Sequence, residues 1–139
     1  MLTYPLTAIV SLVALLVYFY MGLRVGQGRT KYGITAPAVT GHPNFERDYR
    51  IQMNTLEWLP TFLVSLWLFA AAWNSDLIAA GVGVVWIIGR ILYLTGYARA
   101  AEARGPGFGI QAMAVAVLLF GALGRIIWAV VQAALKHHA

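Results

Sequence analysis

Residues 2–23 form an apolar stretch without a charged side chain, and three further stretches of similar character follow. A helix that crosses a bilayer needs about 20 mainly apolar residues, so each stretch is long enough to form one. We place the four helices at about residues 2–23, 45–73, 76–103 and 108–135. A chain of 139 residues has room for no more than four such helices. The sequence therefore predicts one domain, residues 1–139, that is an all-α, four-helix integral membrane bundle.

The composition excludes a soluble domain. Hydrophobic residues make up 60% of the chain and charged residues only 11%, whereas a soluble domain has about 25% charged residues. Intrinsic disorder is excluded as well, because it needs low hydrophobicity and high charge. The net charge of +5 comes from ten Lys and Arg spread between apolar stretches. We therefore attribute it to membrane topology and expect no nucleic-acid partner.

The chain has no cysteine, so it has no disulfide and no thiolate that could bind a metal or act as a nucleophile. Any thiol chemistry has to use a sulfur atom that a ligand brings. His42 is expected in a loop, and His137 and His138 in a frayed C-terminal tail. We therefore expect no metal site.

Polar segments set the predicted helix ends. Residues 24–43 are rich in Gly, Pro and Thr and predict a loop of about twenty residues. Asn44 is a suitable N-cap for the second helix, in which Pro60 predicts a kink. Residues 74–76 predict a tight turn, and residues 105–107 (Gly-Pro-Gly) predict a break before the fourth helix. Four glycines that lie in the third and fourth helices predict close helix packing: Gly81, Gly89, Gly121 and Gly124.

The charges of the three connections predict the orientation in the membrane. The 24–50 connection has a net charge of +3, from Arg24, Arg29, Lys31, Arg47 and Arg50 against Glu46 and Asp48. The 99–107 connection has a net charge of +1, and the turn at residues 74–76 has −1. Because positively charged connections tend to stay in the cytoplasm, we expect the first two to face it. Both termini are then expected on the opposite side.

Polar side chains inside the second and third helices are the candidates for function, because each is costly in lipid unless it is paired or solvated. Arg50, Asn54 and Glu57 lie at positions i, i+4 and i+7 and therefore share one face of the second helix. A second stripe follows positions i, i+3, i+7 and i+14 and consists of Arg90, Tyr93, Tyr97 and Arg104. We expect Glu57 and Arg90, the deepest charges, to form a structural ion pair between the two helices.

The two stripes together fit a small zwitterionic ligand with several carboxylates. A guanidinium group binds a carboxylate through two hydrogen bonds, and Glu57 could bind an ammonium group. Gln52 lies on a different face of its helix and could reach such a ligand only from a neighbouring subunit or in a tilted pose. The residues alone leave other roles open: an interfacial aromatic belt for the two tyrosines, and a snorkelling helix end for Arg104.

Two motifs in these helices resemble the MAPEG family, the membrane-associated proteins in eicosanoid and glutathione metabolism. The first motif is Phe45-Glu46-Arg47-x-Tyr49-Arg50-x-Gln52-x-Asn54-x-x-Glu57-x-x-Pro60, and the second is Arg90-x-x-Tyr93-x-x-Gly96-Tyr97-x-Arg99. The resemblance extends over essentially the whole chain. More than a dozen positions match in order, which hydrophobicity alone would not produce.

The resemblance implies a homotrimer of four-helix subunits, with a glutathione site at each subunit interface that opens to the cytoplasm and the bilayer. By position, it assigns glutathione binding to Arg50, Asn54, Glu57, Tyr93 and Tyr97, with Gln52 and Arg29 assisting. It assigns activation of the thiol to Arg104. The implied function is a membrane-bound glutathione transferase that joins its co-substrate glutathione to lipophilic electrophiles from the bilayer. Glutathione-dependent peroxidase activity is left open.

Two positions depart from the family pattern. Thr30 stands where leukotriene-forming members have a second arginine, and Trp58 stands where they have a tyrosine. Both departures favour a broad transferase over a dedicated leukotriene synthase. Two alternatives remain: a non-catalytic lipid-binding scaffold of the same family, and a small transporter in which Glu57 couples to protons. The predicted partner Arg90 and the lack of an internal repeat weigh against the transporter.

Overall fold

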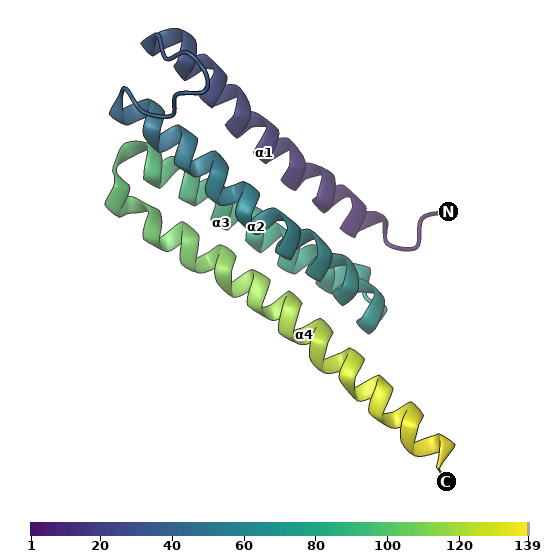
Figure 1. Ribbon diagram of the computed structural model, residues 1–139. Helices are drawn as coiled ribbons and strands as arrows, with labels where there is room; N and C mark the ends of the chain where they lie inside the picture. The colour runs from purple at the N-terminus through teal and green to yellow at the C-terminus, as the bar shows by residue number, and fades with distance from the viewer. Residues whose placement is uncertain (139) are drawn as a thin grey trace.

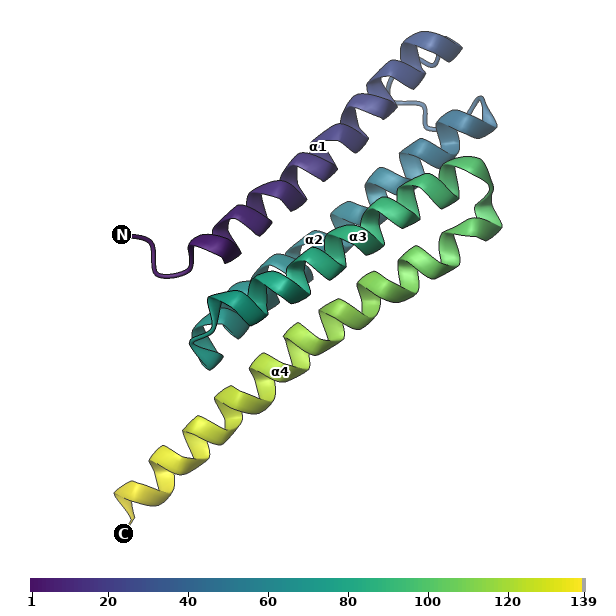
Figure 2. The ribbon, with the colours of Figure 1, turned by 180° about the vertical axis from the view of Figure 1, so that it is seen from behind.

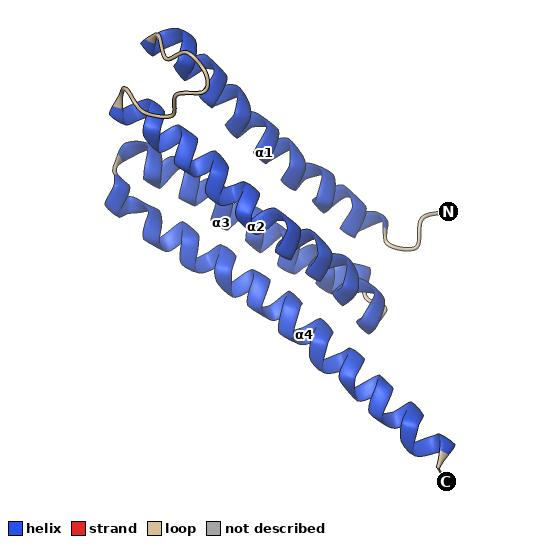
Figure 3. Cartoon of the chain, in the orientation of Figure 1, coloured by secondary structure: helices blue, strands red, loops and turns tan. Residues whose placement is uncertain are grey.

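Four long helices make up nearly the whole structure. The computed structural model describes residues 1–138 of the chain. The helices are α1 (Pro5–Tyr32), α2 (Pro43–Trp73), α3 (Asp76–Arg99) and α4 (Gly105–His137), with a short 3-10 helix, η1 (Ala101–Arg104), before α4. Residues 1–138 contain no strand (Figure 3). All four long helices have the length and apolar composition of a membrane span, so the chain is a multi-pass integral membrane protein.

The helices run up and down beside one another (Figures 1 and 2). Both termini lie at one end of the bundle, whereas the α1–α2 loop and the α3–α4 connection lie at the other end, as the four-span pattern predicts. The C-terminal part of α4 extends past the ends of α2 and α3. Polar connections from two parts of the chain therefore gather at one end of the bundle.

Apolar side chains fill the interior of the bundle and also cover its outside. Inside, Phe62 and Trp86 stack with ring centroids 4.0 Å apart, and Leu118 is fully buried in the same cluster. Outside, Phe19 and Phe120 are 63% and 65% exposed. Such a surface is suited to lipid tails, because each helix satisfies its own backbone hydrogen bonds and presents apolar side chains outward.

Helix α1 is longer than predicted. It continues to Tyr32 and ends at Gly33, which has a left-handed backbone with φ 66°, so the first nine residues of the predicted 24–43 loop are helical. Contacts with α2 explain the extension. The Arg24 guanidinium forms an ion pair with Asp48 at 2.8 Å, and Gly28 is buried against the ring of Phe45. These contacts outweigh the low helix propensity of the glycines in this segment.

The start of α2 also differs from the prediction. The helix begins at Pro43, and its N-cap is His42, whose Nδ1 accepts a hydrogen bond from the backbone N–H of Asn44 at 3.2 Å. Asn44 itself lies in the first turn, and its side chain donates to the hydroxyl of Tyr32. The helix then continues through Pro60 to Trp73.

The break between the last two helices comes earlier than predicted. Helix α3 ends at Arg99 and Ala100 is extended, so the α3 boundary at residue 103 was wrong. Helix α4 begins at Gly105 rather than at residue 108. Pro106 falls in the first turn of α4, where a missing N–H has no intrahelical partner to lose. The Gly-Pro-Gly segment therefore starts the fourth helix instead of separating it from the third.

The predicted turn at residues 74–76 is confirmed, and it also anchors the N-terminus. Asn74 has a left-handed backbone with φ 47°, and the Ser75 hydroxyl caps α3. The Asp76 carboxylate accepts hydrogen bonds from the backbone N–H groups of Leu6 and Thr7, at 2.9 and 2.8 Å, and from the Thr7 hydroxyl at 2.7 Å. One carboxylate thus ties the first turn of α1 to the start of α3.

Candidate functional site

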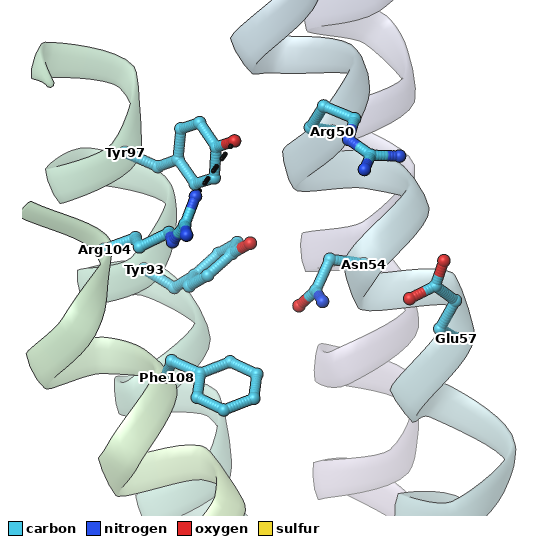
Figure 4. A pocket seen from close by; sticks show the side chains of 7 residues that line it. All are labelled: Arg50, Asn54, Glu57, Tyr93, Tyr97, Arg104 and Phe108. Atoms are coloured by element: carbon cyan, nitrogen blue, oxygen red, sulfur yellow. Dashed lines mark hydrogen bonds between the residues drawn. The ribbon is translucent and has the colours of Figure 1, made fainter. Parts of the chain in front are cut away.

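A polar cavity of about 430 Å³ lies between α2, α3 and the start of α4. Figure 4 shows the side chains of α2 on one side of it and those of α3, η1 and α4 on the other. Six of the seven lining residues belong to the two predicted stripes. The seven are Arg50, Asn54, Glu57, Tyr93, Tyr97, Arg104 and Phe108. The fold therefore brings the two stripes together at one site.

The α2 side of the cavity follows directly from helix periodicity. Arg50, Asn54 and Glu57 are spaced by four and three residues, which stacks them on one face over two turns. Arg50 and Glu57 are exposed, whereas Asn54 is half-buried. A cation, an amide and an anion therefore follow one another along this wall.

The opposite side consists of two phenols and a cation that lies over one of them. The rings of Tyr93 and Tyr97 meet edge to face with centroids 5.5 Å apart. The Arg104 guanidinium lies 5.3 Å from the ring centroid of Tyr97, and its Nη1 is 3.4 Å from the Tyr97 hydroxyl oxygen that accepts its hydrogen bond. Arg104 is exposed at the last position of η1, and Tyr97 holds its charged group over the cavity.

Three glycines let α3, η1 and α4 approach closely enough to build this side. A side chain at Gly96 would collide with the carbonyl oxygen of Ala103, one residue before Arg104. A side chain at Gly107 would collide with the backbone of Tyr93, and one at Gly89 would meet the backbone nitrogen of Gln111 at 2.7 Å.

The close-packing prediction for the glycines is therefore confirmed at Gly89. It also holds at Gly121, where a Cβ would meet the ring of Phe69 at 2.7 Å. At Gly81 and Gly124 a Cβ would meet no atom of residues 1–138 within 4 Å, so these two do not mediate close packing within the chain.

Arg90 lies beneath the cavity, and its predicted ion pair with Glu57 is wrong in this chain. Its side chain is fully buried, and Nη1 donates to Asn54 Oδ1 at 2.8 Å and to Thr55 Oγ1 at 3.1 Å. No ion pair joins it to Glu57 within residues 1–138. Glu57 is exposed one turn further along α2, so the guanidinium meets neutral oxygens instead of a carboxylate.

The buried charge of Arg90 is held by aromatic rings as well as by these oxygens. Its guanidinium carbon is 4.5 Å from the ring centroid of Tyr93 and 5.8 Å from that of Trp86. Its Nε and Nη2 atoms find no hydrogen-bond partner in the part of the chain that the structure describes. A cation without a carboxylate partner therefore lies directly behind two residues of the cavity wall, Asn54 and Tyr93.

Phe108 is the one lining residue that the sequence did not predict. It comes one helical turn after Arg104, and its ring meets Trp58 edge to face with centroids 5.7 Å apart. Trp58 is one of the two positions where the sequence departs from the family pattern, and its ring borders the apolar edge of the cavity through Phe108. A phenylalanine in an apolar helix gives no signal of its own, and only its spacing from Arg104 points to it.

Two predicted ligand residues lie away from this cavity in the single chain. Arg29 donates to the carbonyl of Ala38 at 2.7 Å and lies 5.1 Å from the ring centroid of Phe45, so it holds the α1–α2 loop against α2. Gln52 faces α1, since a Cβ at Gly22 would lie 3.1 Å from its Nε2 atom. Neither lines the cavity.

The charges at the site favour an anionic ligand that also has one positive group. Arg50 and Arg104 on the wall and Arg90 behind it carry three positive charges, whereas Glu57 supplies one negative charge. Two exposed guanidinium groups on opposite walls can each bind a carboxylate, and Glu57 can bind an ammonium group. The apolar rings of Phe108 and Trp58 border the same space.

The sequence model of the MAPEG family matches residues 7–124. The protein belongs to the MAPEG family. The resemblance of its two motifs to this family is thereby confirmed.

Characterised and uncharacterised MAPEG relatives cover most of the chain. Human microsomal glutathione S-transferase 2 is 44% identical over 121 residues, which is 86% of this chain and 81% of the relative. Leukotriene C4 synthase from Cavia porcellus is 37% identical over 134 residues, 94% of this chain and 89% of the relative. An uncharacterized protein from Synechocystis is 46% identical over 121 residues, 87% of this chain and 88% of the relative.

Proposed function

We propose that this MAPEG protein is a membrane-bound glutathione transferase that conjugates glutathione to lipophilic electrophiles. The observation that carries the proposal is the convergence of Arg50, Asn54, Glu57, Tyr93, Tyr97 and Arg104 on one cavity. The names of its relatives, a glutathione S-transferase and leukotriene C4 synthase, support the same class of activity. Glutathione has two carboxylates, one ammonium group and a thiol, which match the charges of the cavity walls.

In this proposal different side chains of the polar walls bind different groups of glutathione. Arg50 binds a carboxylate, and Glu57 binds the ammonium group. Asn54 presents its NH₂ group to a carbonyl or carboxylate oxygen, because its own oxygen already accepts the hydrogen bond from Arg90. The hydroxyls of Tyr93 and Tyr97 supply further donors at the opposite wall.

Arg104 activates the thiol. A free thiol has a pKa of about 8.5, so only a few per cent of it is ionised at neutral pH. A guanidinium group close to the sulfur favours the thiolate, and the proton leaves to water. The thiolate sulfur then forms a C–S bond with the electrophilic carbon, and the bond from that carbon to its leaving group, or the C–O bond of an epoxide, breaks and takes the electron pair. Phe108 and Trp58 offer an apolar surface for a lipophilic substrate that enters from the bilayer.

The roles of Arg29 and Gln52 require a second subunit. Both residues lie outside the cavity of their own chain, so we assign them to the cavity of a neighbour in a homotrimer. The excess of positive charge on the 24–50 and 99–107 connections supports a cytoplasmic location for this end of the bundle. Glutathione-dependent reduction of lipid hydroperoxides is a second reaction that the same thiolate can perform.

A conjugation assay tests the proposal. The purified protein is mixed with glutathione and a chlorodinitrobenzene electrophile, and the rate of thioether formation is followed by absorbance. We expect Arg104→Ala to lower the rate at saturating glutathione and pH 7 by about tenfold to a hundredfold. Much of this loss should be recovered near pH 9.5, where a thiol with a pKa of about 8.5 ionises without help.

Arg99→Ala is the matched control, because Arg99 is exposed in the same connection and lies outside the cavity. It should retain the wild-type rate. If Arg104→Ala keeps the full rate at pH 7, Arg104 has no part in the chemistry. If the wild type shows no glutathione-dependent reaction with any of several electrophiles, the lipid-binding scaffold replaces the transferase.

A further inference from the structure

A second site lies on another side of the bundle, between α1 and α3. An apolar groove of about 450 Å³ runs along these two helices, with Val13, Leu16 and Val17 on α1 and Ile91 and Leu94 on α3. Figure 2 shows this side, where α1 and α3 lie in front of α2. The groove shares no lining residue with the polar cavity. It is therefore a separate feature of the fold.

The groove leads into a polar basin at the end of the bundle that carries the connections. The basin has a volume of about 390 Å³ and is lined by Lys31, Tyr32 and Asp48 among others. Tyr20 and Arg24 line both the groove and the basin, so the two form one continuous surface. One half of this surface is apolar and the other half is polar.

The basin carries a net positive charge. Nε and Nη2 of Arg24 both donate to Asp48 Oδ1, at 3.2 and 2.8 Å, so these two charges balance. Lys31 remains, with its ammonium nitrogen 5.4 Å from the ring centroid of Tyr32. Asp48 is the one acidic residue among those that line the basin. The basin therefore has one positive charge in excess, and two tyrosines, Tyr20 and Tyr32, also line it.

The position of the charges along α1 matches the depth of a bilayer. The uncharged stretch of residues 2–23 ends directly before Arg24, so Val13 to Tyr20 lie at the level of lipid tails. Arg24 and Lys31 then lie at the level of the headgroups, where basic residues attract anionic lipids.

We propose that the groove and the basin together bind one anionic phospholipid, with an acyl chain between α1 and α3 and the phosphate beside Arg24 and Lys31. This binding site is independent of the proposed transferase activity. Lys31 supplies the charge that selects an anionic headgroup over a zwitterionic one. The apolar groove supplies affinity for the acyl chain without selecting the headgroup.

Native mass spectrometry of the purified protein tests this proposal. The protein is exchanged into detergent with equal amounts of phosphatidylglycerol and phosphatidylcholine that have identical acyl chains, and the bound lipid is counted. We expect the wild type to retain phosphatidylglycerol preferentially. Lys31→Gln should reduce this preference about fivefold, and Val13→Trp, which fills the groove, should reduce retention of both lipids.

Two control variants lie far from the site. Lys136→Gln removes a lysine, and Val130→Trp adds the same bulk at an exposed position near the end of α4. Both should retain lipid as the wild type does. Equal retention of the two lipids by the wild type overturns the proposal, and so does an unchanged preference in Lys31→Gln. If Val13→Trp alters the oligomeric state and leaves lipid retention unchanged, a second copy occupies the groove and the proposal is wrong.

Discussion

The Nη1 atom of Arg90 donates a hydrogen bond to Asn54 Oδ1 at 2.8 Å. This bond joins the buried interior to the cavity, since Arg90 has no exposed surface and Asn54 lines the polar wall. It also fixes the amide of Asn54, because the oxygen faces Arg90 and the NH₂ group is left free for a ligand. An arginine that does not line the cavity thus determines which polar group Asn54 presents to it.

Arg90→Met tests this relationship. The variant removes a buried cation that has no carboxylate partner among residues 1–138, so the loss of hydrogen bonds is offset by a smaller desolvation penalty. We expect the free energy of unfolding to change by no more than about 1 kcal/mol. The dissociation constant for glutathione should increase about threefold to tenfold, because the amide of Asn54 can then rotate. Calorimetric titration and denaturation of the same preparations measure both quantities.

Arg90→Lys is the conservative comparison for that experiment. Its ammonium group can donate to Asn54 but lacks the planar fork of arginine, so an intermediate affinity is expected. If Arg90→Met binds glutathione as tightly as the wild type, Asn54 does not depend on Arg90 for its orientation.

Glu57→Gln tests the assignment of the ligand's ammonium group. Loss of a charge-assisted hydrogen bond should raise the dissociation constant for glutathione about tenfold to a hundredfold. An analogue of glutathione that lacks the amino group should bind the wild type and the variant with similar affinity. If Glu57→Gln weakens both ligands to the same degree, the carboxylate acts on the site as a whole and does not bind the ammonium group.

Gly107→Ala tests the close approach of α3 and α4. The added methyl group would collide with the backbone of Tyr93, so we expect the variant to lose about 1–3 kcal/mol of stability. Because the collision displaces the cavity wall, the conjugation rate should fall too. Gly109→Ala is the matched control, since a Cβ there meets nothing within 4 Å among residues 1–138. It should leave stability unchanged or raise it by up to about 1 kcal/mol. Equal unfolding midpoints for the two variants would show that the close approach of Gly107 to the Tyr93 backbone does not contribute to stability.

Asp76→Asn tests the anchor of the N-terminus. The carboxylate accepts three hydrogen bonds from Leu6 and Thr7, whereas an amide offers one oxygen and a competing NH₂ donor. We expect the free energy of unfolding to fall by about 1–2 kcal/mol and the amides in the first turn of α1 to exchange their hydrogens faster. Glu102→Gln, an exposed acid in η1, should change neither. Unchanged exchange at Leu6 and Thr7 in the Asp76 variant would rule out this anchor.

The sequence predicted the spans well and their ends less well. Residues 2–23 identify a membrane helix because the bilayer imposes a minimum apolar length. The ends depend on contacts that the pattern does not contain. Arg24 and Gly28 indicated a loop, yet their contacts with Asp48 and Phe45 keep α1 helical to Tyr32.

In the site, too, the features set by spacing along one helix were predicted, and those that depend on contacts between helices were not. Arg50, Asn54 and Glu57 were found because the spacing along one helix fixes which residues share a face. The partner of Arg90 was not predicted correctly, because spacing along one helix does not fix how two helices are rotated relative to each other. A rotation of less than one turn decides between Glu57 and the pair Asn54 and Thr55. Phe108 was not predicted to line the site, because an aromatic residue in an apolar helix does not stand out from its apolar neighbours.

Glutathione binding to the purified protein tests the central claim most directly. Isothermal titration at pH 7 should show saturable binding with a dissociation constant in the millimolar range or below, and Arg50→Ala should weaken it about tenfold or more. The control Arg99→Ala should bind as the wild type does. Absence of saturable binding by the folded wild type at millimolar glutathione would contradict the account.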